Sequence, residues 1–473
     1  MERLKEKREN NNRKMKILFI HPDISRRDVP NLAIAQLSAC LKEKGHETGI
    51  VDLTFGGNFN TIKTKIINYK PDIIAFSSKT AEFPYHLKLA NRIKDFFEIP
   101  IIFGGVHPTT VPEEVIKYKS IDFICVGEGD LAFPELVESL KKREEPNIKG
   151  IWTKKNKNSF PQLTDLNVIP FMDRDIFDFE KYLKVTDGNI DIIAGRGCVF
   201  SCTYCQNNFI NKKYNGKYHR IRKPTKVIEE LEMLKSKYNV KTFHFHDDTF
   251  TINSKWIEEF CKLYLQKIKV PFICHVRPET LSDKVCNSLK KAGCLFLRMG
   301  IEHGNEEYRK NILKRFYTNN QIIKAFENAK AHGLKTYTYN MVGLPNETKE
   351  LHNETIKLNS LLQPDSTSIS TFVPFPNTEL YDRCISKGLI NKRTNISMSY
   401  KDKSILKNPY LTKNEIRKLE RNFRFKVLKN YTFKKSLYFL IVDHTRFIYK
   451  KIFNFVPLTL RKNIYKFYKR LRK

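Results

Sequence analysis

Short apolar runs alternate with amphipathic stretches over the first 150 residues of the chain. Four runs of five or six residues predict buried strands, at 16–20, 72–77, 100–105 and 122–127. Between them, stretches such as 32–45 and 84–97 repeat apolar residues three and four apart, which predicts helices. Continuous apolar strands joined by helical crossovers are typical of a parallel sheet covered on both faces. We therefore expect an α/β fold that begins with a doubly wound, Rossmann-like domain over residues 15–145.

A second alternation, from about residue 186 to 385, has a different character. Its strands carry polar side chains at every second position, as in "TFHFHDD" (242–248), where Phe243 and Phe245 alternate with histidines. In "CLFLRMGIEHG" (294–304) one face is expected to carry the apolar residues Leu295, Leu297, Met299 and Ile301. Helices packed outside and a polar mouth inside are typical of a partial (β/α) barrel of the TIM type, whose active site lies at the carboxyl ends of the strands.

These patterns divide the chain into a doubly wound domain, a linker at 146–185, a barrel at 186–385 and a basic, helical carboxy-terminal region at 386–473. Net charge is +34, and residues 401–473 hold 22 Lys and Arg against 4 Asp and Glu. A general richness in Lys, Asn and Ile is an alternative source of this charge. We see no separate nucleic-acid-binding module.

The segment 460–473 sets Ile464, Phe467 and Leu471 among basic residues at helical spacing. This pattern predicts a basic tail, from about Lys387 to Lys473, that touches a membrane surface or an anionic substrate. The alternative is that Phe423, Phe425 and Phe433 pack the tail on the barrel.

The sequence predicts a cytoplasmic protein, with peripheral membrane contact as an option. Residues 1–14 are charged and lack the apolar core of a signal peptide. The apolar run at 437–442 is much shorter than the roughly 20 residues of a membrane-spanning helix. Ten cysteines without paired spacings then favour reduced thiols and a metal site over disulfides.

Three of these cysteines form the motif C-x3-C-x2-C in "GRGCVFSCTYCQN" (195–207): Cys198, Cys202 and Cys205. A structural zinc site needs four ligands, and no paired fourth Cys or His stands nearby. Three thiolates on one loop can hold a cubane iron–sulfur cluster and leave its fourth iron open. The other seven are expected to be small buried residues: Cys40, Cys125, Cys261, Cys274, Cys286, Cys294 and Cys384.

Glycines and hydroxyl groups follow the strands of the first domain. Ser77, Ser78 and Thr80 come after one predicted strand, "GGVHPT" (104–109) after the next and "GEGD" (127–130) after the last. Such residues at the strand ends of a doubly wound sheet suit a polar ligand, although glycines there also serve tight turns.

The chain resembles the radical S-adenosylmethionine (SAM) enzymes that carry a cobalamin-binding domain. The cobalamin-domain pattern stands here as Gly104, Gly105, His107, Thr109, Glu113, Glu114, Gly127, Glu128 and Gly129. The resemblance implies cobalamin contacts at Ser77, Thr80, Gly104, Gly105, His107, Gly127 and Glu128. The stretch "HPDISRRDVPN" (21–31) lacks the D-x-H-x-x-G loop that ligates cobalt elsewhere, so we expect no histidine from this loop on cobalt.

The barrel carries the other half of the resemblance, which spans roughly residues 15–385. Tyr204 before Cys205 completes the cysteine motif. Asp247 or Asp248 would lie near the methionine end of SAM, and Glu302 would bond the SAM ribose or amino group. "YNMVGLPNET" (339–348) resembles the adenine-side strand, and "FVPFPNTELY" (372–381) resembles the strand before the carboxy-terminal helices. The implied cofactor contacts are Tyr204, Asp247, Asp248, Arg277, Arg298, Gly300, Glu302, Gly343, Leu344 and Pro345.

Plain alternatives exist for two of these groups. The aspartates could cap the helix that begins "NSKWIEEF", and Gly343–Pro345 could be only a turn.

The resemblance implies a [4Fe-4S] cluster, SAM and cobalamin, with SAM cleaved to a 5′-deoxyadenosyl radical and a methyl group transferred to an unactivated carbon. A small-molecule or lipid substrate and an electron donor such as flavodoxin or ferredoxin would be its partners. Two alternatives stay open: a radical SAM cyclase or oxidoreductase without net methyl transfer, and an iron–sulfur electron-transfer or binding protein.

Overall fold

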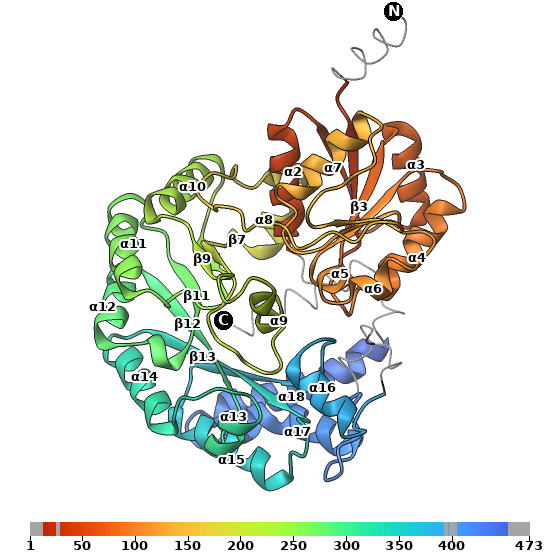
Figure 1. The fold of residues 1–473 in the computed structure, drawn as a ribbon. Coiled ribbons are helices and arrows are strands. Elements are labelled where there is room, and N and C mark those ends of the chain that lie inside the picture. The colour runs from red at the N-terminus through yellow and green to blue at the C-terminus, as the bar shows by residue number, and fades with distance from the viewer. Residues whose placement is uncertain (1–12, 25–28, 392–395, 397–403, 453–473) are drawn as a thin grey trace, which may run out of the picture.

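The computed structural model describes residues 13–24, 29–391, 396 and 404–452, with side chains described up to 443. Its first sheet has six strands in the order β2-β1-β3-β4-β5-β6 (Figure 1). The strands are β1 (Lys16–His21), β2 (Glu47–Asp52), β3 (Ile73–Ser77), β4 (Ile101–Gly104), β5 (Phe123–Cys125) and β6 (Ile151–Trp152). All pair in parallel except β6, which is antiparallel to β5. Strand β2, with its partly polar sequence "ETGIVD", was not among the four strands expected.

Helices cover both faces of this sheet, as the sequence predicts. They are α2 (Leu32–Glu43), α3 (Phe59–Tyr69), α4 (Phe83–Lys94), α5 (Val106–Thr110), α6 (Pro112–Val115) and α7 (Ala132–Lys141). Alternate residues of β1 enter opposite cores: Leu18 packs with α3 and α4, whereas Phe19 packs with α2 and α7. The sheet is therefore doubly wound, and β1 and β3 diverge at its switch point.

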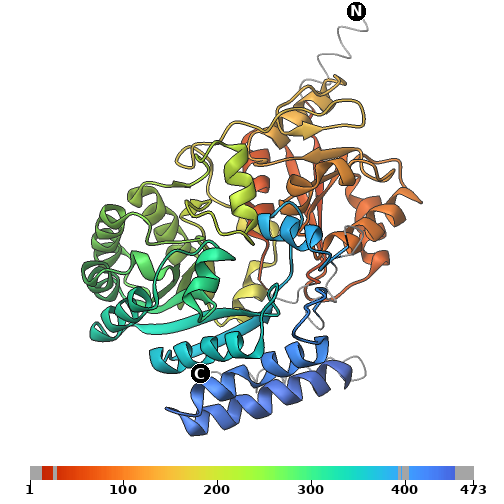
Figure 2. The ribbon, with the colours of Figure 1, turned by 60° about the horizontal axis from the view of Figure 1, so that its bottom comes forward.

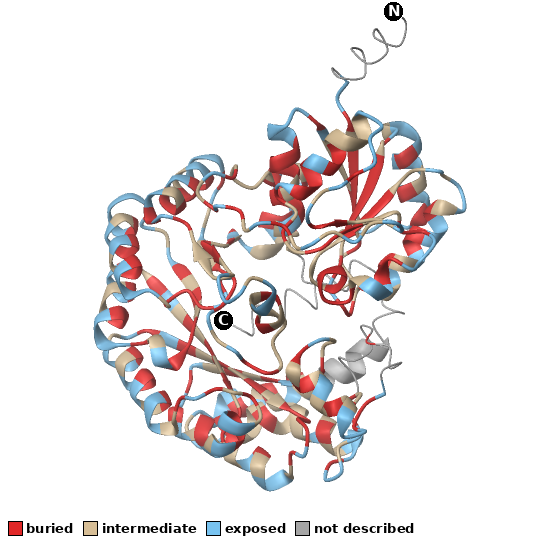
Figure 3. Ribbon diagram, in the orientation of Figure 1, coloured by how far each residue is buried: buried red, intermediate tan, exposed pale blue. Residues whose placement is uncertain are grey.

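The second sheet is a parallel, six-stranded partial barrel in the order β14-β13-β12-β11-β10-β7. Its strands are β7 (Asn189–Ile192), β10 (Thr242–Phe245), β11 (Phe272–Val276), β12 (Cys294–Glu302), β13 (Lys335–Val342) and β14 (Ser366–Thr371). Figure 1 shows an arc of helices outside it: α10 (Pro224–Lys237), α11 (Ser254–Lys267), α12 (Asp283–Lys291), α14 (Asn319–Ala331) and α15 (Lys349–Leu362). The main core fills the space between these helices and the sheet (Figure 3).

Phe243 and Phe245 are fully buried in that core, so the apolar face of β10 points outward to the helices. One expectation for β12 is wrong: Leu295 is 44% exposed. The register between β11 and β12 shifts between the pairs Phe272–Cys294 and Ile273–Phe296. Leu295 is the extra residue of this bulge and turns away from the core.

The stretch 372–381 is not a strand, contrary to its resemblance. Strand β14 ends at Thr371, and α16 (Glu379–Ser386) begins after an irregular segment. Pro374 and Pro376 lack the N–H groups that a further ladder would need.

Residues 146–185, expected as a linker, are largely packed against the first sheet. They contain β6, the short 3₁₀ helix η1 (Arg174–Ile176) and most of α8 (Phe179–Thr186). Tyr182 is 1% exposed in the first domain's core, and its hydroxyl donates to Asp52 at 2.6 Å.

Two helices of the carboxy-terminal region, α17 (Lys413–Leu428) and α18 (Phe433–Ile452), lie side by side under the barrel (Figure 2). Phe423 is fully buried against β14 and α15, Phe425 is half-buried and Phe433 is 63% exposed. The packing alternative therefore holds for Phe423 and not for Phe433. The amphipathic stretch 460–473 lies outside the described residues. No described helix is long and apolar enough to cross a membrane.

Candidate functional site

The three cysteines of the motif lie on one loop at the mouth of the barrel. The loop follows β7 and the short strand β8 (Gly195–Arg196), which pairs with β9 (Arg220–Ile221), and it ends at α9 (Gln206–Lys213). The Thr203 hydroxyl donates to the Ile312 carbonyl at 2.6 Å, and the Leu380 amide donates to the Thr203 carbonyl at 2.9 Å. Segments that follow β12 and β14 thus brace the loop from the far side of the barrel.

The thiols are protected from water to different degrees. Cys198 and Cys202 are buried, and Cys205 is half-buried. A guanidinium N–H of Arg277 donates to the Cys202 sulfur at 3.3 Å, and the Arg277 guanidinium lies 3.5 Å from the centre of the Phe200 ring. Desolvation raises the pKa of Cys205 to about 12 and also raises the pKa of Cys198. These two thiols stay protonated at neutral pH until a bound cation displaces the protons.

The spacing of the sulfurs disfavours a single small ion. A zinc ion about 2.3 Å from three thiolates would hold their sulfurs about 3.8 Å apart. Among the described residues, the only group of three His, Cys, Asp or Glu ligand atoms within 4.8 Å of one another consists of histidines. At least one pair of these sulfurs therefore lies farther apart. The seven other cysteines are buried elsewhere, as predicted, so the donor set fits a cluster held at three irons.

The two aspartates after β10 do different things. The buried carboxylate of Asp247 accepts the backbone N–H groups of Ala194 at 3.0 Å and Gly195 at 2.6 Å, which fixes the start of the cysteine loop. Burial raises the pKa of Asp247 to about 6. Asp248 is exposed and bonds the side chain of Asn207 on α9. Neither aspartate caps α11, because Asn253 does so by accepting from the Trp256 amide.

Glu302 sits in a bulge at the end of β12 with a left-handed backbone, φ +70°. A side chain at position 300 would come within 2.3 Å of the Glu302 carboxylate, so Gly300 makes room for it. Arg315 donates to Glu302 at 3.2 Å and to the Tyr204 hydroxyl at 2.7 Å. Arg315 thus joins the cysteine loop to β12. It bonds only Oε1 of Glu302, so Oε2 does not take part in this contact.

Gly343, Leu344 and Pro345 follow β13 in a buried turn. The N–H groups of Gly343 and Leu344 both donate to Glu347, at 2.5 and 3.1 Å. Glu347 is fully buried. Burial raises its pKa, but the imidazoles of His303 and His352, 3.6 and 3.7 Å from its Oε1, lower the pKa by more, so that the net shift is downward. Glu347 therefore holds the turn, and these two N–H groups are not available to bond a ligand. The turn can contact a ligand only through its surface.

Arg298 lies apart from the cysteines. It is 3.5 Å from the Tyr339 hydroxyl and is paired in register with His275. The structure thus places Arg298 with the polar inner face of the barrel.

At the strand ends of the first sheet lies a cavity of about 260 Å³. It is lined by Phe19, Leu32, Ala33, Gln36, Leu37, Ala75, Phe76, Ser77, Ile102, Gly104, Gly105, Cys125, Gly127, Glu128, Gly129, Asp130, Phe133, Met172, Ile193, Arg196 and Tyr218. Its volume is below that of sites for drug-sized ligands, so it admits a part of cobalamin, such as a base of the nucleotide tail. An apolar lining with a hydroxyl and glycines at its rim fits such a group.

Five of the seven residues expected at cobalamin are therefore at this cavity, and two are not. Thr80 is 4% exposed, and its hydroxyl has no hydrogen-bond partner among the described residues. His107 packs on Phe83, with ring centroids 4.3 Å apart, and burial lowers its pKa to about 4. No histidine is among the described residues that line the cavity, although residues 25–28 of the loop after β1 lie outside the described part.

Glu128 has a further task, because it joins the two domains. Arg220 donates to both of its carboxylate oxygens, one of them at 3.1 Å. Next to this pair, the Arg196 guanidinium donates two hydrogen bonds to the carboxylate of Asp130, at 2.6 and 2.9 Å.

Sequence reasoning missed Arg315 and Glu347. Arg315 belongs to no strand end and is recognisable only through its contacts. Glu347 had a weak signal, as an acid four residues after Gly343 in the turn that follows β13.

Comparisons with known proteins agree with this geometry. The family model of the radical SAM superfamily matches residues 192–358, and that of the B12 binding domain matches residues 25–137. The chain is 29% identical to the uncharacterized methyltransferase PH0819 of Pyrococcus horikoshii, over 89% of this chain and 92% of the relative. It is 27% identical to the anaerobic magnesium-protoporphyrin IX monomethyl ester cyclase of Rubrivivax gelatinosus, over 78% and 69%. The fold is similar to that of the radical SAM methyltransferase TsrM from Kitasatospora setae with cobalamin and a [4Fe-4S] cluster bound, with a TM-score of 0.69 and 16% identity over 79% of this chain and 75% of that one.

Replacing Cys202 by Ala removes the central thiol of the loop and the acceptor of the Arg277 N–H. We expect loss of the cluster absorbance, of bound iron and of SAM cleavage after anaerobic reconstitution. Cys384→Ala is the matched control, because Cys384 is equally buried but lies on α16. Full SAM cleavage in Cys202→Ala would contradict the assignment.

Replacing Gly104 by Val places a side chain in the cavity. A Cβ there meets only Cys125, at 3.6 Å, whereas at Gly105 it would collide with the Ser78 backbone at 2.8 Å. Gly104→Val should therefore lower cobalamin content with little strain, while the iron content stays constant.

Electron paramagnetic resonance of the Co(II) state should show no change when the histidines are labelled with ¹⁵N. An axial coupling that shifts with this label would overturn the expectation that no protein histidine ligates cobalt.

Proposed function

Because the chain is a radical SAM enzyme with a B12-binding domain in front of its barrel, we propose that it transfers a methyl group from SAM to an unactivated carbon of a small-molecule substrate. One observation carries the proposal. The cavity at the strand ends of the first sheet is also lined by Ile193, Arg196 and Tyr218 of the barrel side. Ile193 and Arg196 come directly before the cysteine loop, so a cobalamin at this cavity would adjoin the place where SAM is cleaved.

In this proposal Cys198, Cys202 and Cys205 hold three irons of a [4Fe-4S] cluster. When bound, the cluster supplies an electron that cleaves SAM, and cobalamin supplies a methyl carrier. Arg277 donates to one cluster thiolate and thereby disperses its charge. Arg315 fixes Tyr204 and Glu302 so that the Glu302 carboxylate can accept from the SAM ribose or amino group.

The proposal also includes the remaining expected contacts. Asp248 faces the methionine end of SAM, and the turn at Gly343–Pro345 faces the adenine. Ser77, Gly104, Gly105 and Gly127 receive cobalamin. Asp247, with both carboxylate oxygens on backbone amides, acts as a positioning residue for the loop. The division into domains at 15–145, 186–385 and 386–473 belongs to the same proposal, as does a reduced flavodoxin or ferredoxin as electron donor.

A radical cyclisation or oxidation without methyl transfer is the second candidate, because a curated relative is a cyclase. The products of SAM separate the two. With reductant and reconstituted cofactors, methyl transfer should give both 5′-deoxyadenosine and S-adenosylhomocysteine. Gly104→Val should lose the S-adenosylhomocysteine and keep most of the 5′-deoxyadenosine. 5′-Deoxyadenosine alone from the wild-type chain would favour the second candidate, and neither product would indicate electron transfer.

We also propose that the carboxy-terminal region touches an anionic membrane surface. On α18, Phe433, Leu437 and Ile441 recur every four residues and are 63, 45 and 57% exposed. Phe439 and Val442 on the opposite side are buried. Lys434 and Lys435 follow the first residue of this apolar stripe and are exposed, and each basic side chain close to an anionic surface contributes roughly 1 kcal/mol. The stripe and the charge together suit a helix that lies on the lipid headgroups.

Flotation with anionic vesicles tests this contact. The wild-type chain should float at low salt, and much less at high salt or with neutral vesicles. The triple variant Phe433→Ser, Leu437→Ser, Ile441→Ser should remain in the dense fraction. The variant keeps α17, whose Phe423 packs against β14 and α15. Equal flotation of the two chains would remove this proposal and the suggestion of a lipid substrate with it.

A further inference from the structure

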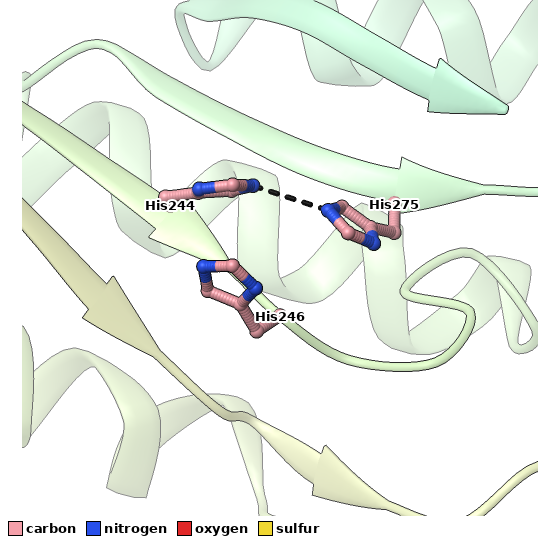
Figure 4. A group of neighbouring side chains, drawn as sticks. All are labelled: His244, His246 and His275. Carbon is pink, nitrogen blue, oxygen red and sulfur yellow. Dashed lines mark hydrogen bonds between the residues drawn. The ribbon is translucent and has the colours of Figure 1, made fainter. Parts of the chain in front are cut away.

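Three imidazoles gather on the inner face of the barrel, away from the cysteine loop. His244 lies on β10, His246 directly after it, and His275 on the neighbouring strand β11 (Figure 4). Each ring offers a nitrogen within 4.8 Å of a nitrogen of the other two. Within the described part of the chain this is the only such group of His, Cys, Asp or Glu. The function proposed above uses none of the three.

The separations suit a small ion. The Nε2 atoms of His244 and His275 are 3.2 Å apart. An ion bound tetrahedrally at about 2.0–2.1 Å by nitrogen holds its ligands about 3.3 Å apart. A hydrogen bond between these two rings explains the same distance but leaves the third ring unexplained. His246 lies against both, with ring centroids 3.9 Å from His244 and 5.4 Å from His275.

A carboxylate stands behind two of the rings. Asp191 on β7 is paired in register with His244, and its Oδ1 is 2.9 Å from His246 Nε2 and 3.7 Å from His244 Nδ1. If each of these nitrogens faces the carboxylate, His246 Nδ1 and His244 Nε2 are the nitrogens left for an ion. A carboxylate behind a ligating imidazole fixes its tautomer and orientation and strengthens it as a ligand.

The type of donor limits which metal suits the site. Neutral imidazoles carry the lone pair that a metal needs, and zinc, copper, iron and nickel suit this donor. Calcium and magnesium prefer oxygen.

We propose that His244, His246 and His275 bind one divalent transition ion of the zinc type, with Asp191 as its outer-sphere partner and one coordination position open. The site is separate from the iron–sulfur site, because Arg277 and Thr249, not these histidines, approach the cysteine sulfurs. It lies deeper in the barrel than the loops, since His244 precedes Asp248 and His275 precedes Arg277 along their strands. An ion there can bind an oxygen of whatever molecule enters the barrel.

Metal content of the full chain tests the site. The chain is purified anaerobically and its cluster is reconstituted. One molar equivalent of zinc per chain is then added, and unbound metal is removed. We expect one zinc per chain, and a loss of at least tenfold in His244→Ala and in His275→Ala, with the iron content unchanged. His332→Ala is the matched control, because His332 also bonds an aspartate, at 2.8 Å, but lies outside the barrel. Zinc X-ray absorption should show nitrogen or oxygen neighbours at about 2.0–2.1 Å.

Three results would overturn the proposal: no zinc retained by the wild-type chain, zinc retained equally by the His→Ala variants, or a sulfur neighbour at about 2.3 Å, which would place the ion on the cysteine loop. Iron content in the same samples reports whether each variant is folded around its cluster. Because the readout is bound zinc, the result does not depend on whether the enzyme transfers a methyl group.

Discussion

The carboxyl ends of the strands of the two sheets must face each other. Two arginine–carboxylate pairs hold the domains in this arrangement. Arg196 and Arg220 lie on the antiparallel strands β8 and β9, which flank the cysteine loop and α9 in the chain, and Asp130 and Glu128 follow the last parallel strand of the first sheet. Both acids are less than a tenth exposed, and both pairs are bidentate. Loss of Arg196 would leave the buried carboxylate of Asp130 without its bidentate partner, and breaking a buried pair in this way costs about 3–5 kcal/mol. The pairs therefore fix the distance and direction between the cavity of one domain and the cysteine loop of the other.

The cysteine loop itself has little regular structure and depends on long-range bonds. Asp247 holds its start, Arg277 holds its middle, and Arg315 holds Tyr204 near its end. Each comes from a different strand end of the barrel, or from the segment beyond it. A site that must keep three sulfurs at fixed positions gains from this arrangement, because each support is itself held by packed secondary structure.

Periodicity was enough to predict the strands that are strongly apolar or strictly alternating, together with the loop that carries the cysteines. It failed where tertiary contacts decide. Strand β2 was missed because "ETGIVD" has little apolar character, and Leu295 was misplaced because a bulge shifts the alternation. Arg315 and Asp130 could not be found from spacing, since their roles exist only across the fold. Thr80 and His107 share a motif with cavity residues yet lie outside the cavity lining, which no one-dimensional pattern reveals.

The inner face of the barrel gives a last constraint. Asp191 lies opposite His244, His275 opposite Arg298, and Arg298 opposite Tyr337, so polar side chains run across neighbouring strands in register. Closed barrels usually fill this space with branched apolar side chains. Here the sheet has six strands and stays open, and its inner polar groups would cost free energy unless they were bonded to each other or to a guest. One carboxylate and one guanidinium balance in charge, and the imidazoles between them supply hydrogen-bond donors and acceptors. Such a lining disfavours a purely apolar guest at this depth and favours one that brings a polar group to the inner face of the barrel.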